Sequence, residues 1–345
     1  MQNPSPSRRE APLKGVRVVD LTRVLAGPYA TMLLADLGAD VIKVERTDQG
    51  EETRIIPPLK NGESHYFLSI NKNKRSIAVD LKAPEGRAII LDLVRQSDVV
   101  IENFRPGVLK RLNLEYETLA EVNPRIILCS ISAYGQTGPW AERSAFDLVI
   151  QAMSGVMSVT GEPGRPPVRL GLPVGDLSGG IYAVIGILGA LYERERSGRG
   201  QAIDVSMLDA LVGQLGYLVG YYAMTGQNPG RVGSGHHNIV PYGAFKAKDG
   251  YIIIAVLTES FWPKLCKALG LEHMVSDPRY ANMEKRKENR DEVNRAIEEV
   301  LQHGTVAEWS EIFLREDVPH APVLEISDVV QHPQLRARNM MVEVE

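Results

Sequence analysis

One aspartate in this sequence has surroundings that suit chemistry. Asp176 lies in the segment GLPVGDLSGG, directly after Gly175 and before a helical pattern whose early residues include Gly179 and Gly180. The dipole and free N–H groups of a helix N-terminus favour an ionised carboxylate, so we expect Asp176 to be charged at pH 7. The glycines leave its backbone uncovered, which lets a bulky substrate approach. This pattern suits a carboxylate nucleophile.

A structural role also explains Asp176, because aspartate is among the best helix N-caps and glycines serve close helix packing. A second glycine segment contains Gly233 and Gly235 and is interpreted as either a lid or a linker. The adjacent His236 and His237 are not at metal-ligand spacing, and HExxH is absent, so no metal is expected. G-x-S-x-G is absent too, which gives a serine hydrolase no support.

The amino-acid composition limits the classes of partner and environment that the protein can have. A net charge of −4 gives no general basic field, so we expect no nucleic-acid partner. The two cysteines, Cys129 and Cys266, lie far apart, which predicts neither a disulfide framework nor a thiolate metal site and fits a reducing cytoplasm. The longest apolar stretch, near Ile181–Leu191, is too short for a bilayer, so no membrane span is expected.

Short β-branched runs alternate with helical patterns from Val16 onward, which predicts βαβ units and a mainly parallel sheet covered on both faces. The fold class is therefore α/β, with a Rossmann-like large domain and a smaller α+β domain. The expected strands are 16–21, 40–45, 76–81, 98–102, 125–132 and 202–207, and the expected helices include 28–38, 83–96, 177–195 and 208–223.

The sequence pattern changes after about residue 225, where the alternation of strands and helices ends. Asp249-Gly250 predicts a hairpin, charged helices follow through Leu314, and 321–326 reads as a strand. We expect a flexible tail at 1–12, a large domain at 13–225, a small domain at 226–330, and at 331–345 a segment that returns toward the large domain and looks shortened.

Ligands of open parallel sheets bind beyond the carboxyl ends of the strands. Arg46 follows one predicted strand, Asn103, Phe104 and Arg105 follow another, and a loop to Arg143 follows a third. Guanidinium groups grip phosphate and an aromatic ring packs on a base, so this edge suits a nucleotide diphosphate. The alternative is that these are solvated surface charges. Neither G-x-G-x-x-G nor a P-loop occurs, so neither a nicotinamide cofactor nor ATP is supported.

Several motifs, in a fixed order over residues 13–345, resemble the class III (CaiB/BaiF-like) CoA-transferases, the family of formyl-CoA transferase and carnitine CoA-transferase. They are VRVVDLTRVLAGPYATMLLADLGADVIKVER, NKNKRSIAVDL, DVVIENFRPGVLKRL, SAYGQTGP, VGDLSGG, GRGQAIDVSMLDA and VPYGAFKAKDGYIIIAV. The resemblance implies that Asp176 is the nucleophile. It also implies CoA contacts at Leu25, Ala26, Arg46, Asn71 to Lys74, Asn103, Phe104, Arg111, Arg143 and Asp147.

The resemblance further implies an interlocked homodimer that takes coenzyme A and acyl-CoA as substrates, with a carboxylic acid as acceptor and no tightly bound cofactor. The branch most similar to this sequence uses succinyl-CoA and dicarboxylates. On this mechanism, backbone N–H groups around Gly175 and Gly179 stabilise oxyanions, while Gly233 to Gly235 shield the intermediates from water. Family members continue several dozen residues beyond MMVEVE.

Two other functions stay open. A 2-methylacyl-CoA racemase shares the architecture, but racemisation needs two proton-transfer groups, and those relatives carry a histidine that this sequence lacks between Ser132 and Ile150. A CoA-binding protein without turnover is the other alternative, and the intact Asp176 with its flanking glycines argues against it.

Overall fold

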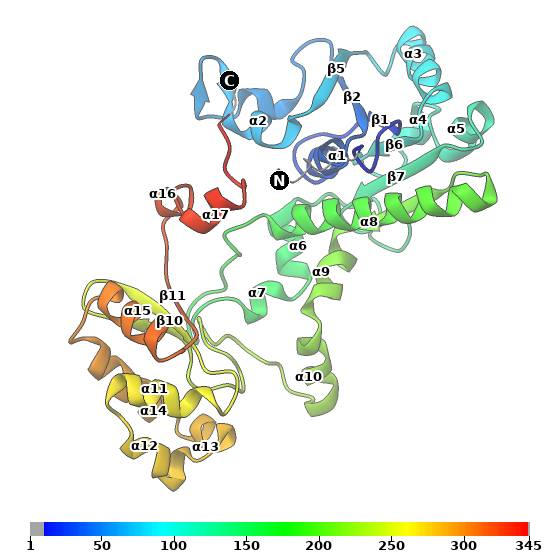
Figure 1. Cartoon of the computed structure of the whole chain (residues 1–345). Helices are drawn as coiled ribbons and strands as arrows, with labels where there is room; N and C mark the ends of the chain where they lie inside the picture. The colour runs from blue at the N-terminus through cyan, green and yellow to red at the C-terminus, as the bar shows by residue number, and fades with distance from the viewer. Residues whose placement is uncertain (1–9, 344–345) are drawn as a thin grey trace. The chain divides into compact units, whose positions relative to one another are not determined.

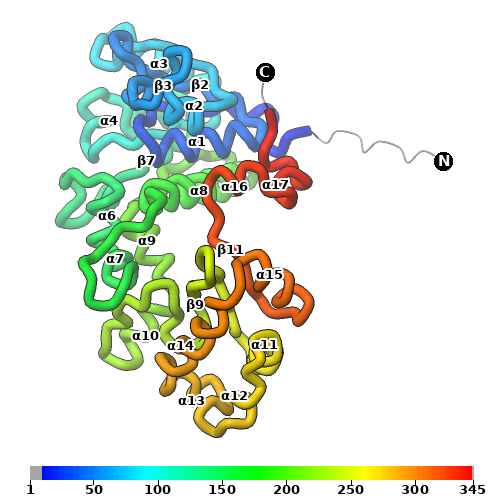
Figure 2. Tube along the Cα trace, turned by 90° about the vertical axis from the view of Figure 1, so that its left-hand side faces the viewer, coloured from blue at the N-terminus to red at the C-terminus, as the bar shows by residue number. Residues whose placement is uncertain are grey.

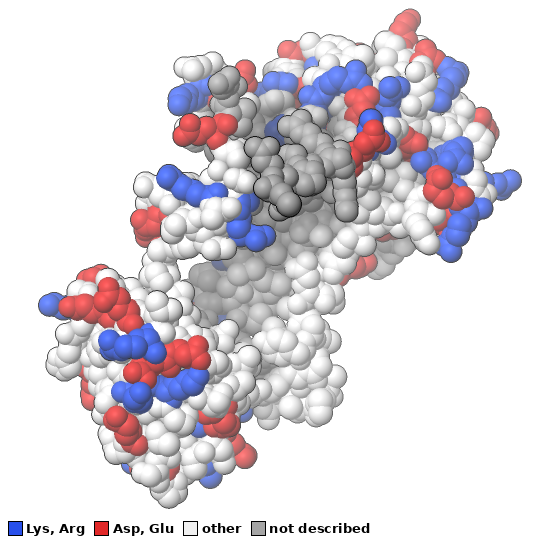
Figure 3. Space-filling view, viewed as in Figure 1, with Lys and Arg blue, Asp and Glu red and all other residues white. Residues whose placement is uncertain are grey.

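The computed structural model describes residues 10–343 and divides the chain into two compact units. The first unit contains residues 10–158 and Val168–Asn228; the second contains Val159–Pro167 and residues 229–343. A short segment from the middle of the chain thus belongs to the second unit. On the face that Figure 3 shows, both units carry basic and acidic side chains interspersed.

A six-stranded sheet forms the centre of the first unit, as Figure 1 shows. All its neighbouring strands are parallel, so the predicted α/β class with a mainly parallel sheet is confirmed. The chain starts in the middle and moves first to one edge and then to the other, which puts a switch point between β1 and β6. The strand order is β5 (Lys74–Ala78), β2 (Asp40–Glu45), β1 (Arg17–Asp20), β6 (Val99–Glu102), β7 (Ile127–Ser132) and β8 (Ala202–Ser206).

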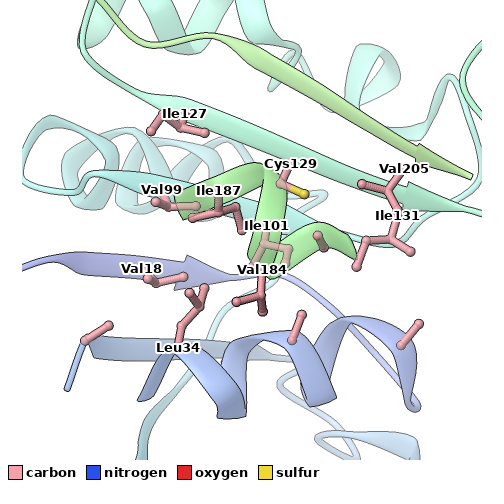
Figure 4. Close-up of a cluster of buried hydrophobic side chains, with 14 of the residues drawn as sticks. Val18, Leu34, Val99, Ile101, Ile127, Cys129, Ile131, Val184, Ile187 and Val205 are labelled. Carbon is pink, nitrogen blue, oxygen red and sulfur yellow. The ribbon is translucent and has the colours of Figure 1, made fainter. Parts of the chain in front are cut away.

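Two helices pack on one face of this sheet, α1 (Ala26–Asp36) and the long α8 (Val174–Ser197). Alternate apolar residues of the strands point to this face and meet both helices in a buried core (Figure 4). Figure 2 shows α1 and α8 side by side. The core includes Val18, Leu34, Ile101, Cys129, Val184 and Ile187.

The opposite face of the sheet carries a second core, which includes Val19, Ile90, Val100, Leu119 and Leu128. Its helices are α3 (Pro84–Arg95), α4 (Val108–Arg111) and α5 (Tyr116–Val122). The first unit also contains η1 (Glu52–Ile55), β3 (Leu59–Lys60), β4 (Glu63–Ser64), α2 (His65–Asn71), α6 (Asp147–Met153), α7 (Val156–Val159), α9 (Met207–Leu215) and α10 (Tyr217–Thr225).

Two helices differ from the prediction. The expected single helix at 208–223 is broken into α9 and α10, because Gly216 adopts φ +51° between them. Helix α8 begins three residues earlier than expected and is long and apolar enough to cross a membrane. The same test is passed by core helices, and Gly179, Ala183 and Ile187 of α8 are buried in the first unit.

In the second unit, β11 (His320–Pro322), β10 (Tyr251–Ala255) and β9 (Tyr242–Lys246) form an antiparallel sheet. The hairpin predicted from Asp249-Gly250 is confirmed as β9–β10, whereas β11 is shorter than expected because a helix begins at Ile326. The helices are α11 (Phe261–Leu269), α12 (His273–Ser276), η2 (Pro278–Tyr280), α13 (Met283–Glu288), α14 (Arg290–Leu301), α15 (Val306–Arg315), α16 (Ile326–Val329) and α17 (Pro333–Ala337).

Candidate functional site

Two cavities of the first unit lie beyond the carboxyl ends of its strands. The Arg46 cavity, about 660 Å³, is lined by residues that follow β2, β5 and β6, among them Arg46, Asp80, Lys82 and Phe104. The Asp176 cavity, about 250 Å³, is lined by Leu25, Ala26, Asn103, Phe104, Arg143 and Asp176. Arg23, Phe104 and Arg105 line both cavities, which makes them neighbours. Because the switch point lies between β1 and β6, this edge is the expected position for a ligand.

The Arg46 cavity has the chemistry of a nucleotide site. Arg46 is exposed and pairs with Asp48 at 2.5 Å, Lys82 is exposed after β5, and the half-buried ring of Phe104 forms part of the wall. The buried carboxyl of Glu102 accepts the Phe104 N–H at 2.6 Å. Sequence reasoning missed Lys82 and Glu102, although each lies at or just after the end of a predicted strand.

Asp176 is the third residue of α8 and is not its N-cap, so the simple capping interpretation is wrong. The N-cap is Pro173, whose side chain has no hydrogen-bonding group, and Asp147 from α6 does the capping instead. Oδ1 of Asp147 accepts the backbone N–H of Gly175 at 2.7 Å and that of Asp176 at 3.4 Å. The other oxygen, Oδ2, accepts Nε2 of Gln151 at 2.6 Å. Asp176 is therefore free of the cap and faces the cavity.

The expectation that Asp176 is fully ionised at pH 7 is also wrong. Burial, and then the nearby charge of Asp147, raise the pKa of Asp176 to about 7. The free N–H groups of the helix that were expected to lower this pKa are taken by Asp147. At neutral pH the carboxyl is thus near half protonation, with a high proton affinity.

Tyr66, on α2, also belongs to this neighbourhood. Burial and then the charges of Asp176, Glu51 and Asp147 raise the pKa of the Tyr66 hydroxyl. No sequence pattern pointed to Tyr66, because α2 reaches the site only through tertiary packing.

The glycines of α8 allow the helix to sit close to its neighbours. A Cβ on Gly180 would lie 2.7 Å from the carbonyl oxygen of Ala26, and one on Gly179 would lie 3.0 Å from Met207. The start of α1, which lines the Asp176 cavity, is therefore packed directly against the helix that carries Asp176. Glycine is needed here for close helix packing, which was the structural alternative; approach of a substrate over these glycines stays a prediction.

Several residues expected to contact CoA line neither cavity, namely Asn71 to Lys74, Arg111 and Asp147. Nζ of Lys74 is buried and donates to Asp20, Asn71 and the Pro28 carbonyl oxygen at 3.2, 2.8 and 2.9 Å. Burial lowers the pKa of Lys74 to about 8 even though Asp20 opposes the shift. Arg111 ends α4 and lines neither cavity. CoA contacts at Asn71 to Lys74, Arg111 and Asp147 stay predictions.

The second glycine segment lies in the second unit and is held in place there. Gly233 adopts φ +60° and donates its N–H to the Gly161 carbonyl oxygen at 3.0 Å. Arg290 donates to the carbonyl oxygens of His236 and His237 at 2.9 and 3.2 Å. A Cβ on Gly235 would lie 3.0 Å from the Val232 carbonyl oxygen. A lid function for Gly233 and Gly235 stays a prediction.

Among residues 10–343, no group of three or more His, Cys, Asp or Glu side chains is arranged to hold a metal ion. The site combines the carboxyls of Asp176 and Glu102, whose pKa values are both raised by burial, with several arginines and an aromatic ring. This arrangement suits group transfer on an anionic, nucleotide-bearing substrate.

Comparison with known proteins shows the family of this chain. The model of CoA-transferase family III matches residues 13–345. The chain is 40% identical to the acetyl-CoA:oxalate CoA-transferase of Acetobacter aceti, over 99% of this chain and 88% of that protein. It is 41% identical to the succinyl-CoA:glutarate CoA-transferase of Homo sapiens, over 97% of this chain and 76% of that protein. A crystal structure of a CAIB/BAIF family protein from Brucella suis superposes with TM-score 0.88 at 40% identity, covering 96% and 89% of the two chains.

Proposed function

The chain belongs to CoA-transferase family III and is a CoA-transferase, and we propose that Asp176 is the nucleophile that carries CoA between two carboxylic acids. The observation that supports this role is the position of Asp176 on the wall of a cavity next to a nucleotide-sized one. Its raised proton affinity supports the same role, because a carboxylate that binds a proton strongly also attacks a carbonyl carbon well.

The proposed reaction has two exchange steps for each substrate. A carboxylate oxygen of Asp176 attacks the carbonyl carbon of the donor thioester, the C–S bond breaks, and CoA leaves as the thiolate. The thiolate then attacks Cγ of Asp176 in the mixed anhydride, the bond from Cγ to the bridging oxygen breaks, and the donor acid leaves. The acceptor carboxylate reverses both steps and restores Asp176. Each state is an activated acyl group, so no ATP is needed.

Backbone groups are available for the oxyanions. The N–H of Gly175 is taken by Asp147, and Gly179 is the sixth residue of α8, where an N–H bonds within the helix. We therefore favour the N–H of Ala26, the first residue of α1, which has no intrahelical partner and borders the Asp176 cavity. Stabilisation by Gly175 and Gly179 stays an untested prediction.

We propose a dicarboxylic acid as acceptor and succinyl-CoA as a donor. Two relatives are named for dicarboxylates, oxalate and glutarate. In this chain Arg143 borders the Asp176 cavity but not the Arg46 cavity, and its guanidinium lies 4.3 Å from the ring centre of Trp140. Within the described residues Arg143 pairs with no carboxylate, so it is available for the distal carboxylate of a substrate.

We also propose that the protein acts as a homodimer. Large apolar side chains of the first unit are strongly exposed, including Phe146 before α6 at 77%, Tyr192 on α8 at 69% and Met224 on α10 at 90%. Exposed apolar surface of this kind marks a protein interface. Light scattering with size-exclusion chromatography tests this state, and a monomer at micromolar concentration would contradict it.

The main experiment traps the intermediate. The protein is incubated with succinyl-CoA and a panel of acids, quenched with hydroxylamine, and analysed by peptide mass spectrometry. We expect a hydroxamate on Asp176 and a new acyl-CoA. Asp176→Ala should show neither while still binding CoA. Asp209→Asn, which alters an exposed first-turn aspartate of α9, is the matched control and should behave as wild type.

A new acyl-CoA formed at near wild-type rate by Asp176→Ala would overturn the role of Asp176. Exchange of α-protons of a 2-methylacyl-CoA with deuterium from the solvent, without CoA transfer, would favour the racemase instead.

A further inference from the structure

The loop between β1 and α1 contains a strained residue. Val24 has φ +64°, in the left-handed region that β-branched residues rarely occupy. A residue in this conformation persists only where its surroundings hold it there. Val24 and its neighbours Arg23, Leu25 and Ala26 all line the Asp176 cavity. The strain is therefore located in the cavity wall.

A buried carboxylate holds Val24 from one side. Oε1 of Glu51 accepts the Val24 N–H at 2.9 Å, and Oε2 pairs with Nζ of Lys43 at 2.8 Å. The side chains of Glu51 and Lys43 are each only 1% exposed. Nζ of Lys43 also donates to the carbonyl oxygen of Thr22 at 2.9 Å. The ion pair thus holds the loop by hydrogen bonds to the backbone of two residues, Thr22 and Val24.

Asn103 holds the residue between these two. Its Oδ1 accepts the Arg23 N–H at 2.8 Å, and its Nδ2 donates to the Arg23 carbonyl oxygen at 2.8 Å. Three consecutive loop residues are thereby fixed by side chains from β2, from the start of η1 and from the end of β6. None of these three side chains comes from the loop itself.

The position of this loop sets the wall that faces Asp176. Ala26 ends the loop and is in close contact with Gly180 of α8, one turn beyond Asp176. A shift of the loop would therefore move the Ala26 N–H relative to the carboxylate. Misplacement of reacting groups by about 1 Å is enough to slow a reaction by up to about 100-fold.

We propose that Glu51 is a positioning residue for CoA transfer: it holds Val24 in its left-handed conformation and so fixes the backbone opposite Asp176. This inference rests on the proposed role of Asp176. In this scheme Glu51 acts through the loop; it also lines the Arg46 cavity, and its Oε1 accepts the Thr53 N–H at 3.5 Å. Lys43 pairs with the other carboxylate oxygen and so holds the Glu51 side chain in the orientation that reaches Val24.

The test separates the hydrogen bond to Val24 from the stability of the buried pair. Lys43→Met is introduced first, so that no variant leaves an unpaired buried cation. In this background, Glu51→Gln keeps an acceptor for the Val24 N–H, whereas Glu51→Met has nearly the same size and no such acceptor. A third variant adds Val24→Gly to the Glu51→Met protein, because glycine adopts φ +64° without strain.

We expect kcat to be about tenfold lower in the Glu51→Met protein than in the Glu51→Gln protein, with KM for acyl-CoA changed less than about threefold. Val24→Gly should recover most of this loss. Hydrogen exchange of the amides of residues 22–26 should be faster in the Glu51→Met protein at equal melting temperature. Equal kcat in the matched pair, or no recovery by Val24→Gly, would overturn the proposal.

Hydrogen exchange also separates this inference from the proposed function. If the wild-type protein transfers no CoA but the exchange difference between the matched variants is present, the proposed function fails and the clamp on Val24 stands. If transfer proceeds normally and the exchange rates are equal, the clamp fails and the proposed function is unaffected.

Discussion

Oδ1 of Asp147 lies 2.7 Å from the backbone nitrogen of Gly175 and 3.4 Å from that of Asp176, so a carboxylate from α6 caps the helix that carries the proposed nucleophile. One side chain therefore has two electrostatic effects. It satisfies the first N–H groups of α8, and its charge contributes to the raised pKa of Asp176. The helix N-terminus, which alone would favour the ionised form, is neutralised by its own cap.

Replacing Asp147 should shift the pH dependence of transfer. Asp176 must be ionised to attack, so kcat is expected to rise with pH through a pKa near 7. Asp147→Asn keeps an acceptor for Gly175 but removes the charge, which lowers the pKa of Asp176. Because burial is the larger cause and remains, we expect the acid limb to move down by only about half a unit to one unit.

The measurement is a pH profile of kcat between pH 5 and 9 for both proteins. Loss of the Gln151 contact should also destabilise the variant by about 1 kcal/mol. If the acid limb of the kcat profile stays in place in Asp147→Asn, or moves to higher pH, the assignment of this limb to Asp176 is contradicted.

Ionisation of Asp176 should lower the free energy of unfolding of the protein as pH rises. The folded protein binds the Asp176 proton more tightly than the unfolded chain, so this contribution is full below pH 3.8 and is lost as pH rises toward 7. Asp176→Asn removes the ionisation, so at pH 8 it should raise the free energy of unfolding by roughly 1–3 kcal/mol. Urea unfolding at pH 5 and pH 8 checks this, with Asp209→Asn as the exposed control. If Asp176→Asn raises the free energy of unfolding no more at pH 8 than at pH 5, this prediction is refuted.

Arg143 should discriminate dicarboxylates from monocarboxylates. Arg143→Ala is expected to raise KM for a dicarboxylate acceptor by about tenfold or more and to leave a monocarboxylate of equal length nearly unchanged. Arg143→Lys should recover only part of the effect, since lysine lacks the planar fork. Initial rates with succinate and butyrate make the comparison, and Arg196→Ala, at an exposed ion pair of α8, is the control. An equal effect on both acids would point to CoA binding instead.

Two glycines of α8 should respond oppositely to alanine. Gly180→Ala places a methyl group 2.7 Å from the Ala26 carbonyl oxygen, which must force α1 and α8 apart at a cost of about 1–3 kcal/mol. Gly189→Ala meets nothing within 4 Å and should stabilise the helix by up to about 1 kcal/mol. Thermal unfolding of both variants provides the test. Similar melting temperatures would show that the close approach at Gly180 is not rigid.

The sequence alone determined the α/β class and most strands of the parallel sheet, and it singled out Asp176 as the candidate nucleophile. These features depend on local patterns: β-branched runs, helical spacing and a glycine-flanked acid are visible residue by residue. The edge that carries Arg46, Asn103 and Phe104 was also predictable, because the ends of parallel strands meet there.

Only the tertiary structure decided the pKa of Asp176 and the contacts of the other charged side chains. That Asp176 is half-protonated near neutral pH depends on burial and on Asp147, which lies 29 residues earlier in the chain. The same holds for Lys74, which the sequence predicted at the CoA site and which is buried beside Asp20, and for Glu51, which no pattern singled out. A pattern records which residue types occur and where. The charge state and the contacts of a side chain depend on what the fold packs around it.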